Sequence, residues 1–134
     1  MAKIEFRRVD DLPYHRSKDV VPPELAAKLS GDELESRSRV HFPGDDERPQ
    51  LFEVVAIPNA VFNAHAHDID EIILVVDGEL HAGSQVLHAG ESMFVPGGTV
   101  YAFRAGPDGL RFFNFRPHAD HTHRSAAEAR ALRA

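Results

Sequence analysis

From residue 51 onward, hydrophobic and polar residues follow the pattern of short β-strands. Apolar, β-branched and aromatic residues gather in the runs LFEVVAI, EIILVV, ELHA, QVLHA, SMFV, VYAF and LRFFNF. Turn-forming residues separate these runs at positions 58–59, 77–78, 82–84, 89–90, 96–98 and 105–109. Short strands that are each closed by turn residues predict an all-β sandwich or barrel. Asp77-Gly78 in particular predicts a two-residue hairpin between IILVV and ELHA.

The first 49 residues show a weaker pattern. In KIEFRRV, Ile4 and Phe6 alternate with charged residues, which predicts a short strand with one solvated face. The segment 32–50 is polar, and its stretch FPGDDERP predicts a long exposed loop.

Between these two segments, PPELAAKLSG predicts a small helix. Pro23 suits its first turn, Leu25 and Leu29 lie on one face at i and i+4, and Gly31 suits the position after its C-terminus.

Residues 117–134 leave the β pattern. Ser125 and Glu128 predict a capping box at the start of a short C-terminal helix, and Leu132 is the only large apolar residue of that helix. We therefore expect a single domain in three parts. A barrel core of residues 50–116 carries residues 1–49 packed on it as a strand, a short helix and a loop, and it is followed by a tail of residues 117–134.

Composition narrows the class of protein. A chain of 134 residues with 43% hydrophobic and 27% charged residues is long enough for one core. The net charge of −6 and the lack of clustered Lys and Arg argue against a nucleic-acid partner. The absence of cysteine excludes disulfides and thiolate metal sites. No apolar run is long enough to span a membrane and no leader pattern is visible, so we expect a cytoplasmic protein without a membrane partner.

A group of metal-capable side chains precedes the run EIILVV. His65 and His67 face the same side of a strand because residues two apart do so, and Glu71 has the same parity. A turn around residues 68–70 would let the Glu71 side chain reach the two imidazoles. Two imidazoles and one carboxylate form the ligand set of a facial triad, which leaves positions open on a divalent metal such as Fe, Zn, Mn, Ni or Cu.

The same residues begin a pattern that resembles the cupin superfamily. The first cupin motif is matched by His65, one residue, His67, three residues, Glu71, six residues and Gly78. The second is matched by Gly90, five residues, Pro96, one residue and Gly98. The resemblance covers roughly residues 50–116. It implies an antiparallel jelly-roll barrel, also described as a double-stranded β-helix, with a metal bound inside one mouth. Gly78 and Gly98 then occupy tight turns that favour positive φ.

The chain departs from this pattern at the fourth metal ligand, where Tyr101 stands in place of histidine. Three roles are open for this residue. Tyr101 can bind the metal as a phenolate, which requires a strongly Lewis-acidic ion because a free tyrosine has a pKa of about 10. It can instead hydrogen-bond a metal-bound water or substrate while His65, His67 and Glu71 hold the ion. The third alternative is that the site has lost its metal and is a polar ligand pocket.

Other polar residues near the motifs are weaker candidates. Asp68 and Asp70 are expected to be solvated loop carboxylates, with hydrogen bonding to a ligand imidazole as the alternative. His81 and His88 are expected on strand surfaces, with a place in the cavity wall as the alternative. The tail histidines resemble a small metal-chelating tract, but on a mobile tail they are expected to have no role in the site; they are His118, His121 and His123.

Aromatic residues are candidates for the walls of a pocket. Phe103 shares its parity with Tyr101, and Phe113 shares its parity with Phe115, so all of these are predicted to face the barrel interior. An aromatic pocket would suit a small, flat or apolar organic ligand.

Two functions remain open. The first is a small metalloenzyme, dioxygenase-like or isomerase-like, in which Glu71 and Tyr101 are catalytic and His65, His67, Glu71 and Tyr101 hold the metal. The second is a non-catalytic sensor or binding module whose barrel holds a small molecule, with or without a metal. The resemblance also implies a homodimer that pairs through its sheets and its N-terminal strand.

Overall fold

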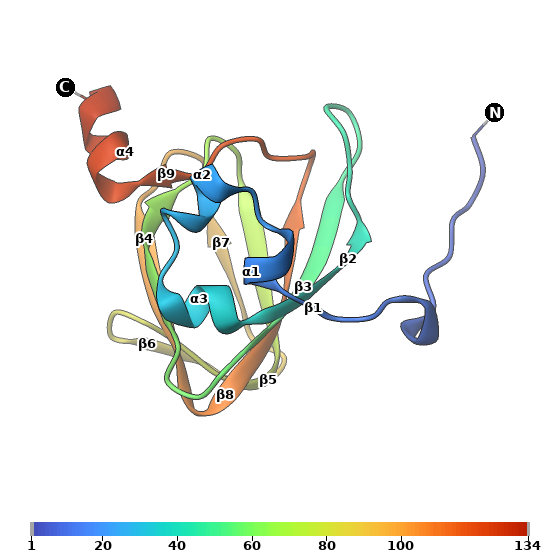
Figure 1. Cartoon of the computed structure of the whole chain (residues 1–134), viewed down its shortest axis with the longest axis horizontal. Helices are drawn as coiled ribbons and strands as arrows, with labels where there is room; N and C mark the ends of the chain where they lie inside the picture. The colour runs from blue at the N-terminus through green and yellow to red at the C-terminus, as the bar shows by residue number, and fades with distance from the viewer. Residues whose placement is uncertain (1, 134) are drawn as a thin grey trace.

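The computed structural model describes residues 2–133, which form nine β-strands, four α-helices and one 3-10 turn (Figure 1). The strands are β1 (His15–Arg16), β2 (Arg37–Phe42), β3 (Gln50–Ala56), β4 (Val61–Ala66), β5 (Glu71–Ala82), β6 (Gln85–Leu87), β7 (Ser92–Val95), β8 (Tyr101–Arg116) and β9 (Arg124–Ser125). The helices are α1 (Ser17–Val20), α2 (Pro23–Ala26), α3 (Gly31–Glu35) and α4 (Ala126–Arg133), and the 3-10 turn η1 covers Val9–Asp11.

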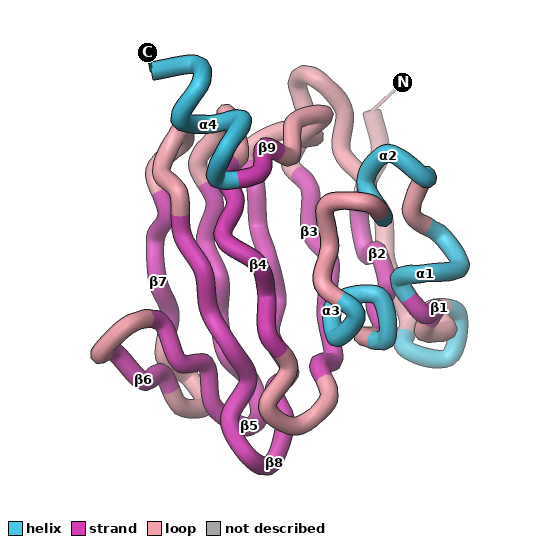
Figure 2. The backbone as a smooth tube through the Cα atoms, turned by 60° about the vertical axis from the view of Figure 1, so that its left-hand side comes forward, coloured by secondary structure: helices cyan, strands magenta, loops and turns pink. Residues whose placement is uncertain are grey.

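The strands pair in antiparallel fashion around the long strand β8. One edge of β8 pairs with β5, and the other edge pairs first with β4 and then with β3 along its length. β6 and β7 add to β5, whereas β2 and β1 extend the sheet beyond β3. The long strands curve, so that the sheet encloses an interior (Figure 2). This confirms the predicted all-β jelly-roll barrel with short helices near both ends.

The predicted hairpin at Asp77-Gly78 is wrong, because β5 continues through these residues to Ala82. Gly78 instead marks a bend. It has a φ of +76° and its neighbours shift register against β8, where Gly109 has a φ of +92°. A Cβ on Gly78 would collide with the carbonyl oxygen of Gly109. The two glycines therefore let β5 and β8 cross closely while both strands bend.

The turn predicted at residues 105–109 is also wrong, because β8 continues through them and joins VYAF to LRFFNF in one strand. The turns around β6 and β7 are confirmed. β5 and β6 are joined by a tight hairpin in which Ala82 pairs with Gln85. Gly90 lies in the turn before β7, and β7 ends immediately before Pro96. Gly98 has a φ of +82°, as the tight turn after β7 requires.

The two halves of β8 present opposite parities to the interior. Phe103 faces inward in the first half, as predicted from its parity with Tyr101. After the irregular segment opposite Gly78, the inward residues are Phe112 and Asn114, whereas Phe115 is exposed. The prediction that Phe113 and Phe115 line the interior is therefore wrong. A register shift within the strand reverses which residues face the core.

The predicted strand in KIEFRRV does not form. Residues 2–8 are extended but pair with no strand, and Figure 1 shows this segment leading away from the barrel. Ile4 and Phe6 are 81% and 71% exposed. Arg7 makes the main contact of the segment by donating from Nε to the carbonyl oxygen of His41 at 2.7 Å. An alternating pattern alone therefore gives no strand where no neighbouring edge pairs with it.

Two further expectations for the first 50 residues need correction. α2 begins at Pro23 as predicted, but Gly31 is the first residue of α3 and does not cap α2. Ser30 and Glu33 form a capping box that starts α3. The segment 32–50 also contains β2, which pairs with β3, and only residues 43–49 form the predicted loop.

The C-terminal helix α4 begins as predicted. Glu128 N donates to Ser125 Oγ and Ser125 N donates to Glu128 Oε1, both at 3.2 Å. Ala129 is buried against the barrel, whereas Leu132 is exposed, so the helix is lightly docked. None of the helices within residues 2–133 is long and apolar enough to cross a membrane.

Candidate functional site

A cavity of about 620 Å³ lies inside the barrel. Its walls are largely apolar and include Phe52, Phe62, Phe103 and Phe112 from the strands, with Leu25 and Leu29 from the α2 region. One end, which we call the polar end, is lined by His65, His67, Tyr101, Asn114, Arg116 and His123. Polar side chains of residues 17–38 also line the cavity: Ser17, Glu24, Lys28, Glu33 and Ser38. The cavity is therefore mainly apolar with a cluster of polar side chains at one end, the usual design of a small-molecule site.

The structure brings the four predicted site residues together at this polar end. His65 lies near the end of β4 and pairs in register with Tyr101, the first residue of β8. His67 follows β4, and Glu71 begins β5. The Tyr101 hydroxyl donates a short hydrogen bond to Glu71 Oε1 and lies 3.2 Å from His65 Nε2. The hydroxyl thus has one proton and two acceptors.

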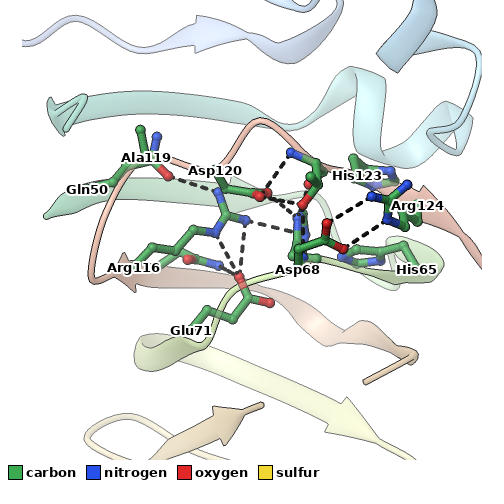
Figure 3. A network of polar contacts seen from close by, with 12 residues as sticks. Gln50, His65, Asp68, Glu71, Arg116, Ala119, Asp120, His123 and Arg124 are labelled. Carbon is green, nitrogen blue, oxygen red and sulfur yellow. Dashed lines mark hydrogen bonds and ion pairs between the residues drawn. The ribbon is translucent and has the colours of Figure 1, made fainter. Parts of the chain in front are cut away.

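Arg116, the last residue of β8, binds the other oxygen of Glu71. Its Nε and Nη2 both lie 3.1 Å from Glu71 Oε2, which also accepts from Asn114 Nδ2 at 3.1 Å. Nη2 of Arg116 also lies 3.4 Å from His67 Nε2, and Nη1 donates to Gln50 Oε1 at 2.9 Å. Figure 3 shows the guanidinium between Glu71 and the C-terminal segment. Glu71 is 1% exposed, so this network supplies the partners that a buried carboxylate needs.

Both site histidines carry their hydrogen on Nδ1. His65 Nδ1 lies 2.6 Å from the carbonyl oxygen of Asn63. His67 Nδ1 lies 2.5 Å from Asp120 Oδ2 and 2.7 Å from the carbonyl oxygen of Thr122. Because these partners are acceptors only, both Nδ1 atoms must donate, and both Nε2 atoms direct a lone pair inward when the rings are neutral.

Residues 117–123, which we call the strap, connect β8 to β9 and complete the polar end. The ring of His123 stacks on His65 with centroids 4.7 Å apart and planes inclined by 4°. Lys28 Nζ donates to the carbonyl oxygen of His123 at 2.8 Å. Immediately after the strap, Arg124 binds both carboxylate oxygens of Asp68, at 2.9 and 2.8 Å (Figure 3). The end of the strap is thus held by Lys28 at His123 and by Asp68 at the following residue, Arg124.

The environment keeps Tyr101 protonated and Glu71 ionised. Burial, and then the charge of Glu71, raise the pKa of Tyr101. Burial alone would raise the pKa of Glu71, but the charges of Arg116 and His67 and the hydrogen bonds from Tyr101 and Asn114 outweigh it and lower that pKa. The pair therefore presents a phenol held by a carboxylate at neutral pH.

The stacked imidazoles are kept neutral. Burial is the largest effect on both, and it lowers the pKa of His65 and that of His123, the latter to about 4. The neighbouring imidazoles act in the same direction on His123. At neutral pH, His65 therefore keeps a free lone pair on Nε2, facing the Tyr101 hydroxyl and the cavity.

The side-chain types that bind the metal in cupins are present, but their donor atoms contact other side chains of the protein. His67 Nε2 and Glu71 Oε2 both contact Arg116, whereas Glu71 Oε1 and His65 Nε2 both contact the Tyr101 hydroxyl. No group of three His, Asp or Glu side chains within residues 2–133 could hold a metal ion. A guanidinium in contact with two of the ligands also repels a divalent cation. As placed, His65, His67, Glu71 and Tyr101 do not fit a metal.

Two buried polar atoms in the described chain, Asn114 Oδ1 and His123 Nδ1, have no hydrogen-bond partner. Both residues line the cavity. An unpaired buried polar atom costs free energy unless a bound molecule or water satisfies it. These atoms therefore mark where a ligand with polar hydrogens can bind.

The other candidate residues lie away from the polar end or act indirectly. His81 and His88 bind Glu79 and do not line the cavity. Asp68 binds Arg124, and Asp70 accepts from the backbone N–H of Gly97 at 2.8 Å. Neither aspartate contacts a site imidazole; Asp120 does so instead.

The tail histidines differ from one another. His118 lies outside the cavity, and His121 is mostly exposed and lies 3.4 Å from Asp46 at the cavity rim. His123 is part of the polar end, so the prediction that this tract has no role is wrong for His123.

Sequence reasoning missed four residues of the polar end: Asn114, Arg116, Asp120 and His123. One signal in the sequence could have found two of them: Asn114 and Arg116 alternate with Phe113 and Phe115. Polar residues at every second position of a buried strand suggest a site. Asp120 and His123 reach the site only through tertiary contacts of the strap, which no local pattern reveals.

Comparisons with known proteins agree with this architecture. The family model described as Cupin matches residues 38–134. The polyketide cyclase RemF from Streptomyces resistomycificus has a similar structure, with a TM-score of 0.70 and 21% identity over 92% of this chain and 86% of that one. No curated protein matches the sequence.

Two cupins named for their likeness to RmlC are also similar. The one from Shewanella frigidimarina has a TM-score of 0.62 and 20% identity over 85% of this chain and 90% of that one. The one from Ralstonia eutropha has a TM-score of 0.69 and 12% identity over 97% and 84%. These identities support the fold alone, whereas the family model spans most of the chain. The chain therefore belongs to the cupin family.

Proposed function

We propose that this cupin binds a small, neutral and mainly apolar organic molecule and transfers a proton on it, as an isomerase-like enzyme does. The observation that carries this proposal is the Tyr101 hydroxyl, which faces an apolar cavity while it is shared between Glu71 Oε1 and His65 Nε2. A single proton between two acceptors leaves one acceptor available to a ligand.

The charges at the polar end favour a neutral ligand. Glu71 is paired with Arg116, and Asp120 is bound to His67. A charged molecule would bring an unpaired charge among the apolar walls, which is costly. The unpaired atoms Asn114 Oδ1 and His123 Nδ1 suit a ligand that carries a hydroxyl group beside its apolar body.

The geometry assigns a role to each residue. When a ligand binds, Tyr101 turns its one hydroxyl proton from Glu71 Oε1 to a ligand oxygen, such as a carbonyl, and Glu71 keeps its hydrogen bonds from Arg116 and Asn114. His65 Nε2 accepts a proton from the adjacent carbon and returns it at another position. Glu71, behind Tyr101, orients the phenol before the ligand binds and acts only through it. Of the predicted pair of catalytic residues, Tyr101 thus touches the ligand and Glu71 positions Tyr101.

The proposed reaction differs from the predicted metal-dependent one. A site for Fe, Zn, Mn or Ni would need Glu71 and His67 to leave Arg116. RemF is named a polyketide cyclase, and a polyketide is the size and polarity of molecule that this cavity suits. The proposal rests on the cavity, because an identity of 21% supports the fold alone.

Deuterium exchange tests the proposal. A panel of aromatic ketones with exchangeable α-hydrogens, such as 2-tetralone, is incubated with the protein in D2O, and binding and exchange are followed by NMR. We expect at least one ketone to bind and its α-hydrogens to exchange faster than in buffer. Binding without faster exchange would favour the alternative function, a non-catalytic binding module. Failure of the whole panel to bind would refute the proposed ligand class.

A further inference from the structure

Arg116 is held more firmly than a surface arginine. Its guanidinium contacts Glu71 with two nitrogens at 3.1 Å, Gln50 at 2.9 Å and His67 at 3.4 Å. It also lies 5.1 Å from the centroid of the Phe52 ring. The residue is 8% exposed. A guanidinium cannot lose its proton in a protein, so a permanent positive charge is fixed at this point.

The positive charge of Arg116 lies where a metal held by His67 and Glu71 would also lie. An ion bound by His67 would have to contact Nε2, because Nδ1 is held by Asp120, and an ion shared with Glu71 Oε2 would lie between these two atoms. In this chain Arg116 contacts both atoms. Arg116 lies on β8, the strand that pairs directly with β5, and the next residues along, Phe115 and Ile72, pair in register. The guanidinium therefore reaches the Glu71 carboxylate from the adjacent strand.

The buried carboxylate explains why some cation is needed. Glu71 is almost fully buried, and an ionised carboxylate in that position is unstable without a positive partner. Arg116 supplies the charge, and Asn114 and Tyr101 supply the remaining hydrogen bonds. The site is thus electrostatically complete without an ion.

We propose that Arg116 is a built-in replacement for the metal of this site, and that it prevents divalent cations from binding to His65, His67 and Glu71. Removal of the guanidinium leaves a buried carboxylate and two inward imidazole lone pairs without their cation. The variant Arg116→Met should therefore acquire a metal site that the natural chain does not have. This inference is independent of which ligand the cavity binds.

Cobalt binding tests it, because Co²⁺ in an imidazole and carboxylate site absorbs visible light. Wild type, Arg116→Met, Arg116→Lys and the double variant Arg116→Met/Glu71→Gln are titrated with Co²⁺, and metal retained after gel filtration is measured by elemental analysis. We expect Arg116→Met to bind Co²⁺ on the order of 100-fold more tightly than wild type. The double variant should lose this gain, and Arg116→Lys should resemble wild type because it keeps a positive charge.

Histidines outside the site, such as His121, give a background of Co²⁺ uptake. The single variant Glu71→Gln measures this background, because it keeps those histidines and Arg116. Wild type that retains Co²⁺ in a Glu71-dependent manner would overturn the inference, as would a folded Arg116→Met that gains no affinity. If Arg116→Met does not fold, the comparison of wild type with Glu71→Gln decides: equal uptake supports the inference, and greater uptake by wild type refutes it. No organic ligand is present, so this result is separate from that of the ketone experiment.

Discussion

Asp120 accepts a hydrogen bond of 2.5 Å from Nδ1 of His67, a residue 53 positions earlier in the chain. Both side chains are buried, and burial alone would raise the pKa of Asp120, but the hydrogen bonds from His67 and Thr122 lower it well below its usual range. This contact joins the strap to the first motif and fixes the hydrogen of His67 on Nδ1. The polar end therefore depends on a residue outside the barrel strands.

The variant Asp120→Asn removes the charge of this contact. We expect the free energy of unfolding to fall by about 1–3 kcal/mol, because a buried donor loses a charged acceptor. Urea denaturation measures the difference. Asp46→Asn is the matched control, since Asp46 is 90% exposed and only meets His121 at the surface. It should change stability by less than about 0.5 kcal/mol. Equal losses in the two variants would contradict the importance of the buried contact.

The chain contains two tyrosines, and each donates a hydrogen bond to a buried glutamate. Tyr101 binds Glu71 in the cavity, whereas Tyr14 binds Glu53 on the other side of the sheet at 2.5 Å. If a ketone exchanges, Tyr101→Phe should slow the exchange by about 100-fold or more, because proton transfer loses its donor. Tyr14→Phe should lose stability without slowing the exchange. A similar rate loss in both variants would show that Tyr101 acts only through stability.

Protonation of His123 should loosen the strap in acid. An unfolded histidine has a pKa near 6.5, and that of His123 in the folded chain is lowered to about 4. Between these values the unfolded chain binds a proton that the folded chain does not, so stability falls as pH decreases from 6.5 to 4. His123→Phe keeps a ring against His65 but cannot titrate. Thermal unfolding at several pH values should show a smaller loss for this variant; parallel curves would contradict the assignment.

Backbone conformation at the bend of β5 gives a test of the fold. Gly78→Ala requires positive φ at alanine and a collision with the Gly109 carbonyl, so we expect a loss of about 3 kcal/mol or more. Gly83 has a φ of +58° but open space around it. Gly83→Ala should therefore cost only about 1 kcal/mol, the penalty of the left-handed conformation. Chemical denaturation compares the two, and equal costs would refute the close crossing.

The outer face of the barrel should bind a second copy of the chain. Ile72 pairs in register with both Phe94 and Phe115, and all three are exposed, with Phe94 at 60%. Such a patch suits an isologous dimer interface. Light scattering should give twice the chain mass of 14.9 kDa, and Phe94→Ser should reduce it to one chain. Val86→Ser, on another exposed strand, should leave the dimer intact. A monomeric wild type would remove this expectation.

The sequence predicted the barrel and half of the polar end for one physical reason. Strand parity and turn residues are local, so His65, His67 and Phe103 could be placed on the inner face without the structure. The bend at Gly78 was misread as a hairpin because a two-residue turn and a strand bend use the same residues. The register shift in β8 turns Phe115 outward and Asn114 inward. Counting alternate residues along the strand cannot predict this reversal, because the count assumes a strand without a shift.

The strap separates contact with the ligand from the packing of the barrel. It is continuous in sequence and lies outside the paired strands, yet it supplies Asp120 and His123 to the polar end. The choice of ligand can therefore change through residues 117–123 while the barrel core keeps its packing. A library that keeps Asp120 and randomises the other residues of this short segment would explore new ligands while the barrel strands stay the same.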